Sequence, residues 1–315
     1  NGNNWSIVKV DYNNGDTNTA DYLKKNSSNG LFITNGQDVW ASTNQGANWT
    51  KVNDDFHGAE TYNTAVFAID RNDNLIIVDT NEQVWKSTNS GVSFSKINSS
   101  FSGGTSNALD IAINNSNSYF VFDGVSDVWK STDSGLNWSK VNDDYNGGAA
   151  NGGNGMDSNS SGGLFIVDGQ DVWVSINQGV NWTKINDDFN GATNLSNAQL
   201  IYTDSRDRLY IVDTNEDVYI STNSGVTFNI LASDMNGAGS NVMGLTSLLI
   251  LTNLSIQVRN CSSSDCSDGV WQNINLNNIN LVGRYFQYMT NFTSPAAGYT
   301  PSLSSVTLNY NILDN

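Results

Sequence analysis

A chain of 315 residues can hold one large repeat domain or two ordinary domains. Its 31 acidic residues outnumber 14 basic residues, and the net charge of −17 would repel both a nucleic-acid backbone and a bare anionic membrane surface. Apolar stretches such as residues 248–251 are far too short to cross a bilayer, so neither nucleic-acid binding nor membrane insertion is expected. With 28 glycines, 2 prolines and abundant asparagine, the composition suits tight turns better than long helices.

The N-terminal segment 2–8, GNNWSIV, resembles the second half of a unit that recurs further along the chain. Gly2 lies 44 residues before Gly46, the first glycine of that unit. Segment 2–8 would be the last strand of a unit whose earlier strands are missing from the N-terminus. This suggests that it completes a sheet whose other strands come from the C-terminal region. Such pairing would remove an exposed sheet edge. We therefore expect the strand of Trp5 to pair with the C-terminal region, in the same chain or in a neighbouring copy.

An eight-residue pattern, Ser-x-Asn/Asp-x-Gly-x-x-Trp/Phe, occurs five times between residues 42 and 228. Its glycines follow one another at intervals of 45, 44, 44 and 46 residues, and this near-constant period indicates a repeat architecture. The fixed positions are Ser42, Asn44, Gly46 and Trp49; Ser87, Asn89, Gly91 and Phe94; Ser131, Asp133, Gly135 and Trp138; Ser175, Asn177, Gly179 and Trp182; and Ser221, Asn223, Gly225 and Phe228.

Each unit also contains four short runs rich in β-branched and aromatic residues, separated by Gly- and Asn-rich turns. In the second unit the pattern is preceded by AVFAID from Ala65, LIIVDT from Leu75 and QVWKST from Gln83. In the first unit it is followed by TKVNDDF from Thr50. Runs of this kind predict strands joined by hairpins. Four strands in about 44 residues match one blade of a β-propeller.

The eight-residue pattern resembles the Asp-box (BNR) repeat of sialidase-like propellers, other glycan hydrolases and sortilin-type receptors, and the likeness covers residues 40–230 well. The resemblance implies an all-β propeller, and we expect the N-terminal strand to help close the ring. We expect six or seven blades: counting the units gives seven if the C-terminal region forms two blades, and a smaller ring if that region is a β-sandwich. In that family the box is the turn between the third and fourth strands of a blade and lies away from the catalytic face. Only Asp133 keeps the acidic residue of the box, and asparagine stands in the other four.

Residues 233–315 are less regular, and two interpretations remain open. The runs SLLILT, SIQVRN and GVWQNI predict a degenerate blade, whereas GRYFQYMTNFTS and TPSLSSVTLNYN resemble the end of a β-sandwich module of bacterial and archaeal surface proteins. We divide the chain into propeller repeats at 1–232 and a C-terminal β-module at 233–315.

The two cysteines, Cys261 and Cys266, lie close together in a Ser- and Asp-rich stretch. This placement predicts a short-range disulfide and therefore an oxidising, extracellular compartment. Two free thiols are the alternative. Two cysteines and one histidine make a zinc site improbable.

The enzyme hypothesis starts from the resemblance, because sialidases hold the substrate carboxylate with three arginines. The arginines here are Arg71, Arg206 and Arg208 in hairpin turns, and Arg259 and Arg284 in the irregular C-terminal region. Another glycosidase would need two carboxylates across a cleft. Only three glutamates are present, Glu60, Glu82 and Glu216, and most aspartates recur at repeat positions. His57 is interpreted as a solvated loop residue, so no catalytic residue is predicted.

Two further kinds of site rest on short patterns. The segment DTNED places the oxygen ligands Asp213, Asn215 and Asp217 at alternate positions, as calcium loops do, so a structural calcium ion is the one cofactor considered. Asx turns are the alternative. Asn-x-Ser/Thr sequons, including those at Asn48, Asn137, Asn181 and Asn291, are about as numerous as the composition predicts, so the sequence alone does not indicate glycosylation.

Three functions follow, in order of preference. The first is a non-catalytic, secreted or cell-surface protein, either a structural subunit of a surface assembly or filament, or an adhesin. The second is a glycan-binding propeller whose loop aromatics Tyr62, Tyr145 and Tyr299 stack on sugars. The third is an Asp-box glycoside hydrolase. The partners expected are further copies of the chain or surface glycans.

Overall fold

The computed structural model describes residues 8–9, 11–13, 20–58, 60–104, 106–148, 153–191, 196–233, 253–261, 266–267, 272–273 and 285–293. The distribution of contacts divides the chain into two compact units, residues 2–248 and residues 249–315 together with Asn1. The predicted boundary between residues 232 and 233 adjoins residues 234–250, which lie outside the described residues, so it stays a prediction. The strand expected around Trp5 also lies outside them, and its pairing stays a prediction.

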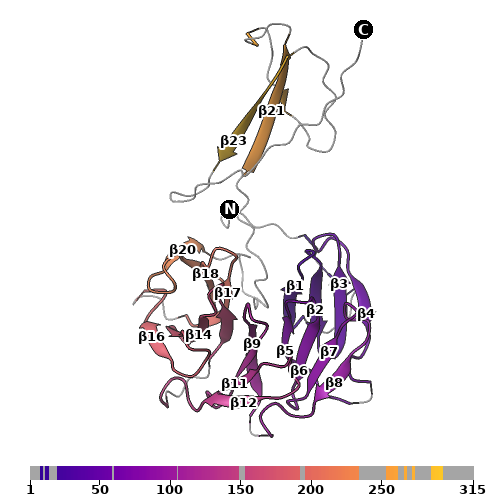
Figure 1. The fold of residues 1–315 in the computed structure, drawn as a ribbon, viewed down its shortest axis with the longest axis vertical. Coiled ribbons are helices and arrows are strands. Elements are labelled where there is room, and N and C mark those ends of the chain that lie inside the picture. The colour runs from indigo at the N-terminus through magenta and orange to yellow at the C-terminus, as the bar shows by residue number, and fades with distance from the viewer. Residues whose placement is uncertain are drawn as a thin grey trace. The chain divides into compact units, whose positions relative to one another are not determined.

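The larger unit contains five four-stranded antiparallel sheets, the blades of a β-propeller (Figure 1). Blade 1 consists of β1 (Tyr22–Lys25), β2 (Leu31–Asn35), β3 (Asp38–Ser42) and β4 (Thr50–Asn53). Blade 2 consists of β5 (Thr64–Ile69), β6 (Leu75–Asp79), β7 (Val84–Ser87) and β8 (Ser95–Asn98). Blade 3 consists of β9 (Ala108–Ile113), β10 (Tyr119–Asp123), β11 (Val128–Ser131) and β12 (Ser139–Asn142). Blade 4 consists of β13 (Gly155–Ser158), β14 (Leu164–Asp168), β15 (Asp171–Ser175) and β16 (Thr183–Asn186). Blade 5 consists of β17 (Ala198–Thr203), β18 (Leu209–Asp213), β19 (Val218–Ser221) and β20 (Asn229–Ala232).

The first strands of successive blades lie beside one another, β1 with β5, β5 with β9, β9 with β13 and β13 with β17. Within every blade the strands follow chain order. The first strand is therefore the innermost and the fourth the outermost. The all-β propeller predicted from the repeat is confirmed.

The predicted number of six or seven blades is wrong, because the described residues form a propeller of five blades. The higher counts took the region after residue 232 to supply further blades. The described strands of that region, β21 (Asn253–Cys261), β22 (Gln272–Asn273) and β23 (Tyr285–Thr293), form a separate three-stranded sheet in the order β22-β21-β23. Its two long strands have nine residues each, whereas the blade strands have four to six. This geometry does not match a blade.

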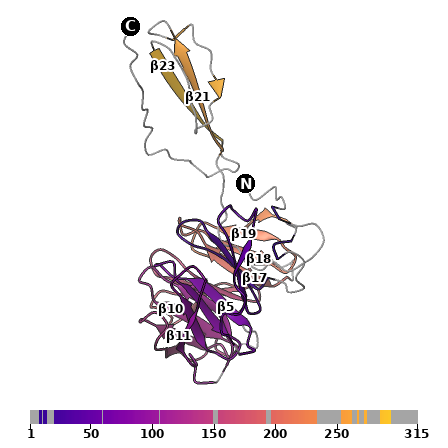
Figure 2. The ribbon, with the colours of Figure 1, turned by 90° about the vertical axis from the view of Figure 1, so that its right-hand side faces the viewer.

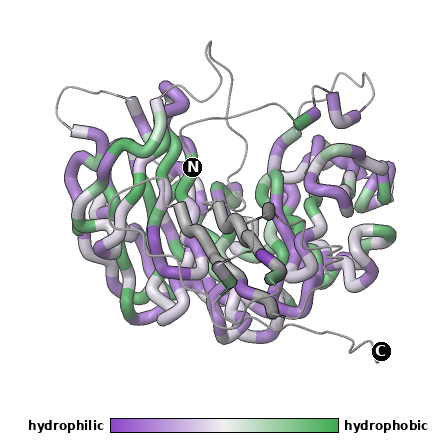
Figure 3. The backbone as a smooth tube through the Cα atoms, turned by 90° about the horizontal axis from the view of Figure 1, so that it is seen from above, coloured by the Kyte–Doolittle hydropathy of each residue, from purple (hydrophilic) through white to green (hydrophobic). Residues whose placement is uncertain are grey.

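The second strand of each blade is largely buried on both faces, and the sheets of blades 2–4 pack between two neighbouring sheets. All five residues of β6, β10, β14 and β18 are buried. Near-continuous apolar runs such as LIIVD and YFVFD meet this requirement, since both alternating faces need apolar side chains. Figure 3 shows hydrophobic segments of the chain in green, alternating with hydrophilic segments in purple.

An aromatic residue that follows the fourth strand of one blade packs against two aromatic residues of the next. Phe101, which follows blade 2, is 2% exposed and meets Trp129 and Trp138 of blade 3 edge-on, with ring centroids 6.0 and 5.9 Å apart. The equivalent sets are Phe56 with Trp85 and Phe94, Tyr145 with Trp173 and Trp182, and Phe189 with Tyr219 and Phe228. Edge-to-face packing of this kind adds attraction to the burial of the rings.

Tyr12 supplies the same contact to blade 1, with ring centroids 5.8 Å from Trp40 and 6.1 Å from Trp49. The carboxylate of Asp11 accepts a hydrogen bond from the backbone N–H of Asn13, just as Asp55 accepts one from His57. Residues 11–13 therefore repeat the local structure that follows blade 1. The N-terminal segment gives blade 1 the aromatic residue that each of blades 1–4 gives to its successor.

Two series of polar contacts also join neighbouring blades. At the end of the fourth strand an asparagine donates its side-chain N–H to a carbonyl of the next blade's repeated turn, as Asn98 does to Leu136 at 2.9 Å. The same donors and acceptors are Asn53 to Val92, Asn142 to Val180 and Asn186 to Val226. Ala232 occupies this position in blade 5, paired with Val218 as Asn98 is with Val84, and has no amide to donate.

The turns between first and second strands form the other series. The carboxylate of Asp73 in blade 2 accepts hydrogen bonds from the N–H and the hydroxyl of Ser27 in blade 1, at 2.9 and 2.6 Å. Asp207 of blade 5 receives the same pair of bonds from Ser160 of blade 4. Asn117 accepts from the N–H of Arg71. These side-chain bonds tie the turns of adjacent blades together along one face of the propeller.

In the smaller unit, β21 and β23 run antiparallel over their whole length (Figure 2). The register places Arg259 opposite Gln287, and the guanidinium donates hydrogen bonds to the amide oxygen. A β-sandwich in this region would require a second sheet packed on this one, so the sandwich stays a prediction. Among the described residues of either unit, no helix is long and apolar enough to cross a membrane.

Replacing Phe101 by alanine tests the aromatic contact between blades. Because the ring is buried against two tryptophans, we expect the Phe101→Ala variant to lose about 3–5 kcal/mol of unfolding free energy, measured by urea denaturation. The control is Val125→Ala, at a side chain that is 56% exposed, which should change stability by no more than about 0.5 kcal/mol. Equal losses in the two variants would contradict the role assigned to Phe101.

Candidate functional site

The five repeated eight-residue turns lie between the third and fourth strands of the blades and share one hydrogen-bond pattern. In the first, the hydroxyl of Ser42 accepts from the N–H of Gly46 at 2.9 Å and donates to the amide oxygen of Asn44 at 3.0 Å. That oxygen also accepts from the N–H of Asn48 at 2.8 Å. Where the turn ends in tryptophan, as at Trp49, the indole N–H donates to the glycine carbonyl at 3.0 Å. These residues build the turn.

The glycines of these turns also pack against the preceding blade. Gly91 has a φ of 86°, a left-handed conformation that favours glycine. A Cβ atom placed there would come within 3.2 Å of Val39 and 3.3 Å of Val52, both in blade 1. The close approach explains the glycine as well as the backbone conformation does. The Ser, Asn/Asp, Gly and aromatic residues identified in the sequence thus form the repeated turns and serve the structure of the blades.

On the opposite side of the blades, a lysine of the fourth strand lies over a tryptophan of the third and between carboxylates. Lys140 is 5.4 Å from the Trp129 ring centroid, 2.5 Å from a carboxylate oxygen of Asp127 and 2.9 Å from one of Asp143. Lys51 and Lys184 make the same set of contacts with Trp40, Asp38 and Asp54 and with Trp173, Asp171 and Asp187. Ile230 replaces the lysine in blade 5, opposite Tyr219. The sequence interpretation missed this set, although the spacing of the NDD segments contains it.

Blade 2 differs from the other blades in the carboxylates around its lysine, and this polar cluster is the least repetitive one in the described part of the propeller. Lys96 lies 5.1 Å from the Trp85 ring centroid, but Gln83 and Ser99 stand where other blades have aspartates. Glu60, from the linker after blade 1, supplies the carboxylate instead, with an oxygen 2.7 Å from the lysine nitrogen. Hydrogen bonding to Lys96 lowers the pKa of Glu60, so the carboxylate stays ionised and is unsuited to act as a general acid.

His57 lies beside this cluster, and the interpretation of it as a solvated loop residue is wrong. Its side chain is 0% exposed. The ring packs on Phe56 and Trp85, with centroids 4.4 and 5.8 Å away. Its Nε2 donates to the carbonyl of Tyr62, and its Nδ1 lies 2.8 Å from a carboxylate oxygen of Asp55. Its position in a linker gave no sign of this burial, because the covering ring of Trp85 comes from the next blade.

Glu82 holds a linker in place. It lies in the hairpin between β6 and β7 with a φ of 65°, and it is 5% exposed. Its carboxylate accepts hydrogen bonds from the hydroxyls of Ser100 and Ser102 and from the N–H groups of Gly104 and Ser106, at 2.5–2.9 Å. Burial raises the pKa of this carboxyl, but the four hydrogen bonds outweigh burial and the pKa lies below its ordinary value. Glu216 occupies the equivalent hairpin of blade 5, with a φ of 63° and 2% exposure.

Two aspartates of the innermost strands bridge neighbouring blades. Asp110 of β9 accepts from the N–H of Met156 in β13 at 2.8 Å, and Asp157 of β13 accepts from the N–H of Thr203 in β17 at 2.6 Å. These bonds satisfy backbone donors at sheet edges. Burial raises the pKa of both carboxyls, and that of Asp157 rises to about 6. The positive charge of Lys24 opposes the rise in both, and the charge of Asp110 adds to the rise in Asp157.

The calcium hypothesis at Asp213, Asn215 and Asp217 stays a prediction. The carboxylate of Asp213 is 0% exposed and accepts hydrogen bonds from the N–H groups of Asn215 and Asp217, at 2.9 and 3.0 Å, and from the hydroxyl of Ser196. Asp79 and Asp123 accept the same pair of backbone bonds in blades 2 and 3. Within the described residues, no three His, Cys, Asp or Glu side chains are grouped so that they could hold a metal ion.

The side chains of two propeller arginines are engaged, one within its own turn and one with the turn of the next blade, whereas Arg206 is exposed. The guanidinium of Arg208 donates to Asp204, with Nε 2.6 Å from the carboxylate, and Nε of Arg71 donates to the carbonyl of Asn114 at 3.4 Å. Tyr145, predicted to stack on sugars, is 4% exposed because it fills the junction between blades 3 and 4. Tyr62 is half-buried, and Tyr299 lies outside the described residues.

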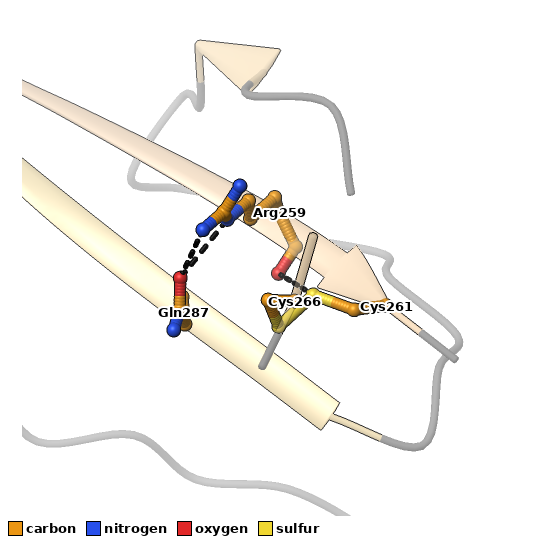
Figure 4. Close-up of a disulfide and its surroundings, with 4 residues drawn as sticks. All are labelled: Arg259, Cys261, Cys266 and Gln287. Atoms are coloured by element: carbon orange, nitrogen blue, oxygen red, sulfur yellow. Dashed lines mark hydrogen bonds between the residues drawn. A yellow bond between two sulfur atoms is a disulfide. The ribbon is translucent and has the colours of Figure 1, made fainter. Parts of the chain in front are cut away.

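In the smaller unit, Cys261 and Cys266 form a disulfide, as predicted, and both are buried (Figure 4). The bond joins the end of β21 to the segment that follows it. Figure 4 places it beside the Arg259–Gln287 hydrogen bonds. A loop closed over five positions removes little chain entropy, so the bond fixes the local shape of the strand end.

Comparisons with known proteins agree with the propeller. Residues 37–161, less than half of the chain, match the family described as Sortilin-Vps10 (sortilin, neurotensin receptor 3). No curated protein sequence matches the chain. Among solved structures, YCF48 bound to D1 peptide superposes with a TM-score of 0.50 at 18% identity, over 73% of this chain and 74% of that one.

Two bacterial structures are similar to the same extent. The GH74 xyloglucanase from Xanthomonas campestris gives a TM-score of 0.52 at 14% identity, over 72% of this chain and 40% of the enzyme. The extracellular domain of a hybrid two-component system from B. thetaiotaomicron gives 0.52 at 8% identity, over 70% and 28%. At these identities the likeness establishes the β-propeller fold alone.

Replacing Glu82 by glutamine tests the linker clamp. We expect Glu82→Gln to lower the free energy of unfolding at pH 7 by about 2–4 kcal/mol, because the charge that receives four hydrogen bonds is lost. The pKa is lower in the folded than in the unfolded chain. The stabilisation is therefore present above about pH 4.3 and is lost as the pH falls through the folded value.

Urea denaturation of wild type and Glu82→Gln at several values between pH 3 and 7 measures this, and the two stabilities should converge at the acid end. Asp143→Asn, at an exposed ion pair with Lys140, is the control and should leave stability nearly unchanged. A constant difference at every pH would contradict the role of the ionised Glu82.

Asp157 gives the opposite pH dependence. Its folded pKa of about 6 exceeds the unfolded value of about 3.9, so the folded chain binds more protons between these values and wild type loses stability as the pH rises through them. Asp157→Asn should not show this loss of stability with rising pH. The substitution also removes an acceptor, because asparagine has one acceptor oxygen where the carboxylate has two, and this part of its effect should be the same at every pH. Unfolding midpoints at pH 4, 5, 6 and 7 test the difference, and parallel profiles would contradict it.

Proposed function

We propose that this protein is a non-catalytic extracellular protein, a structural subunit of a surface assembly or filament, or an adhesin, and that its repeated turns are Asp boxes of the sialidase-like type. The main support is that the side chains best suited to acid–base chemistry serve the fold. The His57 side chain is 0% exposed, Glu82 clamps a linker, and Glu60 is paired with Lys96. Catalytic carboxyl groups need one neutral acid beside an ionised partner, and the lowered pKa of Glu60 opposes such a role.

Three observations support an extracellular location. The chain carries the Cys261–Cys266 disulfide, which persists in oxidising compartments. Part of it matches the Sortilin-Vps10 family, and one structural neighbour is an extracellular domain. The propeller is cross-tied by aromatic contacts, asparagine donors and turn-to-turn bonds, which suit a rigid building block. Its partners would be further copies of the chain or surface glycans.

The enzymatic alternative has a specific test, because one structural neighbour is a GH74 xyloglucanase. Incubation of the purified protein with xyloglucan or with sialosides should release no sugar above a boiled control. Release that is abolished in Glu60→Gln, the variant at the least repetitive carboxylate, would overturn the proposal. Release that Glu60→Gln leaves unchanged would also overturn it and would locate the acid elsewhere.

The location and assembly have a test of their own. Immunogold electron microscopy of native cells, with an antibody against the propeller, should place the protein outside the cell, in filaments or a surface layer or at sites of adhesion. Gold confined to the cytoplasm would overturn the extracellular role. Dispersed extracellular monomers in cells that show no adhesion would overturn the assembly and adhesin roles.

A further inference from the structure

Three of the repeated turns carry a sequon in the same place and orientation. These are Asn48-Trp49-Thr50 in blade 1, Asn137-Trp138-Ser139 in blade 3 and Asn181-Trp182-Thr183 in blade 4. In each, the asparagine and the hydroxyl residue are exposed and the tryptophan between them is half-buried. The tryptophan is held inward because its indole N–H donates to the glycine carbonyl of the turn at 3.0 Å.

This arrangement orients the two residues that define a sequon. In extended backbone, residues i and i+2 point to the same side and residue i+1 to the other. Each hydroxyl residue here is the first of a fourth strand, at the start of β4, β12 or β16. The asparagine and the hydroxyl therefore face solvent together, as recognition of the pair requires.

Four other sequons in the described part of the propeller differ, because the fold uses their side chains. Asn98 donates its amide N–H to the carbonyl of Leu136 in the next blade, and Ser100 of the same sequon donates to Glu82. Asn114 is 3% exposed, and its amide oxygen accepts from the N–H groups of Ser116 and Ser118, both at 3.0 Å. A sugar on the amide nitrogen of Asn98 would disturb its bond to Leu136, and the buried amide of Asn114 leaves no room for a sugar.

The asparagines at Asn26 and Asn159 are also used. Their amide oxygens accept at 2.7 Å from the N–H groups of Gly30 and Gly163, closing the turns between first and second strands. By contrast, the side-chain amides of Asn48 and Asn181 make no hydrogen bond within the part of the chain that the structure describes. The amide of Asn137 donates to Asp133 at 2.7 Å. The number of sequons is what composition predicts, but the structure separates those whose asparagine side chain is used by the fold from those whose side chain is exposed and unbonded.

We propose that Asn48 and Asn181, and less completely Asn137, carry N-linked oligosaccharides. In the transfer, the amide nitrogen forms a bond to the anomeric carbon of an oligosaccharide donor linked to a lipid phosphate. The carbon–phosphate oxygen bond breaks, the lipid phosphate leaves, and the amide gives up one proton. The sugars would lie beside exposed apolar side chains of the same turns, such as Val180, which is 47% exposed, and would cover them.

The inference rests on the proposed extracellular location, and protein isolated from its native source tests it. Protease digestion and mass spectrometry with electron-transfer fragmentation should find glycan on the peptides of Asn48 and Asn181, lower occupancy at Asn137, and unmodified Asn98 and Asn114. The paired variants Asn48→Gln and Asn181→Gln, made in that source, should each lose one glycan mass while keeping the wild-type unfolding midpoint. Asn98→Gln should instead lower the midpoint without losing a glycan.

The outcomes separate the two proposals. Extracellular protein with unmodified Asn48 and Asn181 would overturn glycosylation and leave the proposed function standing. Equal occupancy at Asn98 and Asn48 would show that the fold does not select the sites and would also overturn it. Protein found only inside cells would overturn both.

Discussion

The structure depends on one contact made again and again: an aromatic ring that follows the fourth strand of a blade lies between two aromatic rings of the next sheet. A four-stranded sheet of this size is apolar on both faces and has no core of its own. Each blade is stable only while both faces are covered, and the rings of Phe56, Phe101, Tyr145 and Phe189 fix how neighbouring sheets meet. Phe56, Phe101 and Tyr145 touch the same tryptophans over which Lys96, Lys140 and Lys184 lie, and Tyr12 touches Trp40, over which Lys51 lies. The polar surface of the blades is therefore built on the same aromatic pairs as the interior.

The buried carboxylates also serve the packing of the blades. A buried carboxylate is costly unless hydrogen bonds satisfy it, and here that cost is offset by backbone groups that would otherwise lack partners. Asp110 and Asp157 cover donors at the edges of innermost strands, and Glu82 collects four donors of a linker that has no regular structure. An acidic chain can thus hold many of its carboxylates in structural positions. In these positions they are poorly placed to act on a substrate.

The sequence predicted the parts of the fold that depend on neighbours in the chain. The hydrogen bonds of the repeated turn join residues two to four positions apart, so a fixed spacing of Ser, Asn and Gly was enough to locate all five. The Cys261–Cys266 bond is equally local. The number of blades was wrong because it was counted through a region whose strands, β21 and β23, are twice the length of most blade strands. The burial of His57 and of Tyr145, and the linker clamp of Glu82, depend on residues of other turns and blades, and periodicity does not contain that information.

The direction of the aromatic contact has a consequence for how the chain reaches its native state. In every pair the ring comes from the segment that precedes its partners in the sequence, beginning with Tyr12 before blade 1. A growing chain therefore presents each ring before the sheet that will receive it has been synthesised. Every new blade can then dock on a finished one, with no need to wait for a distant segment. Contacts between adjacent units keep sequence separation short, which favours fast, stepwise folding from the N-terminus. A propeller joined in this way can add its blades in the order in which they are translated.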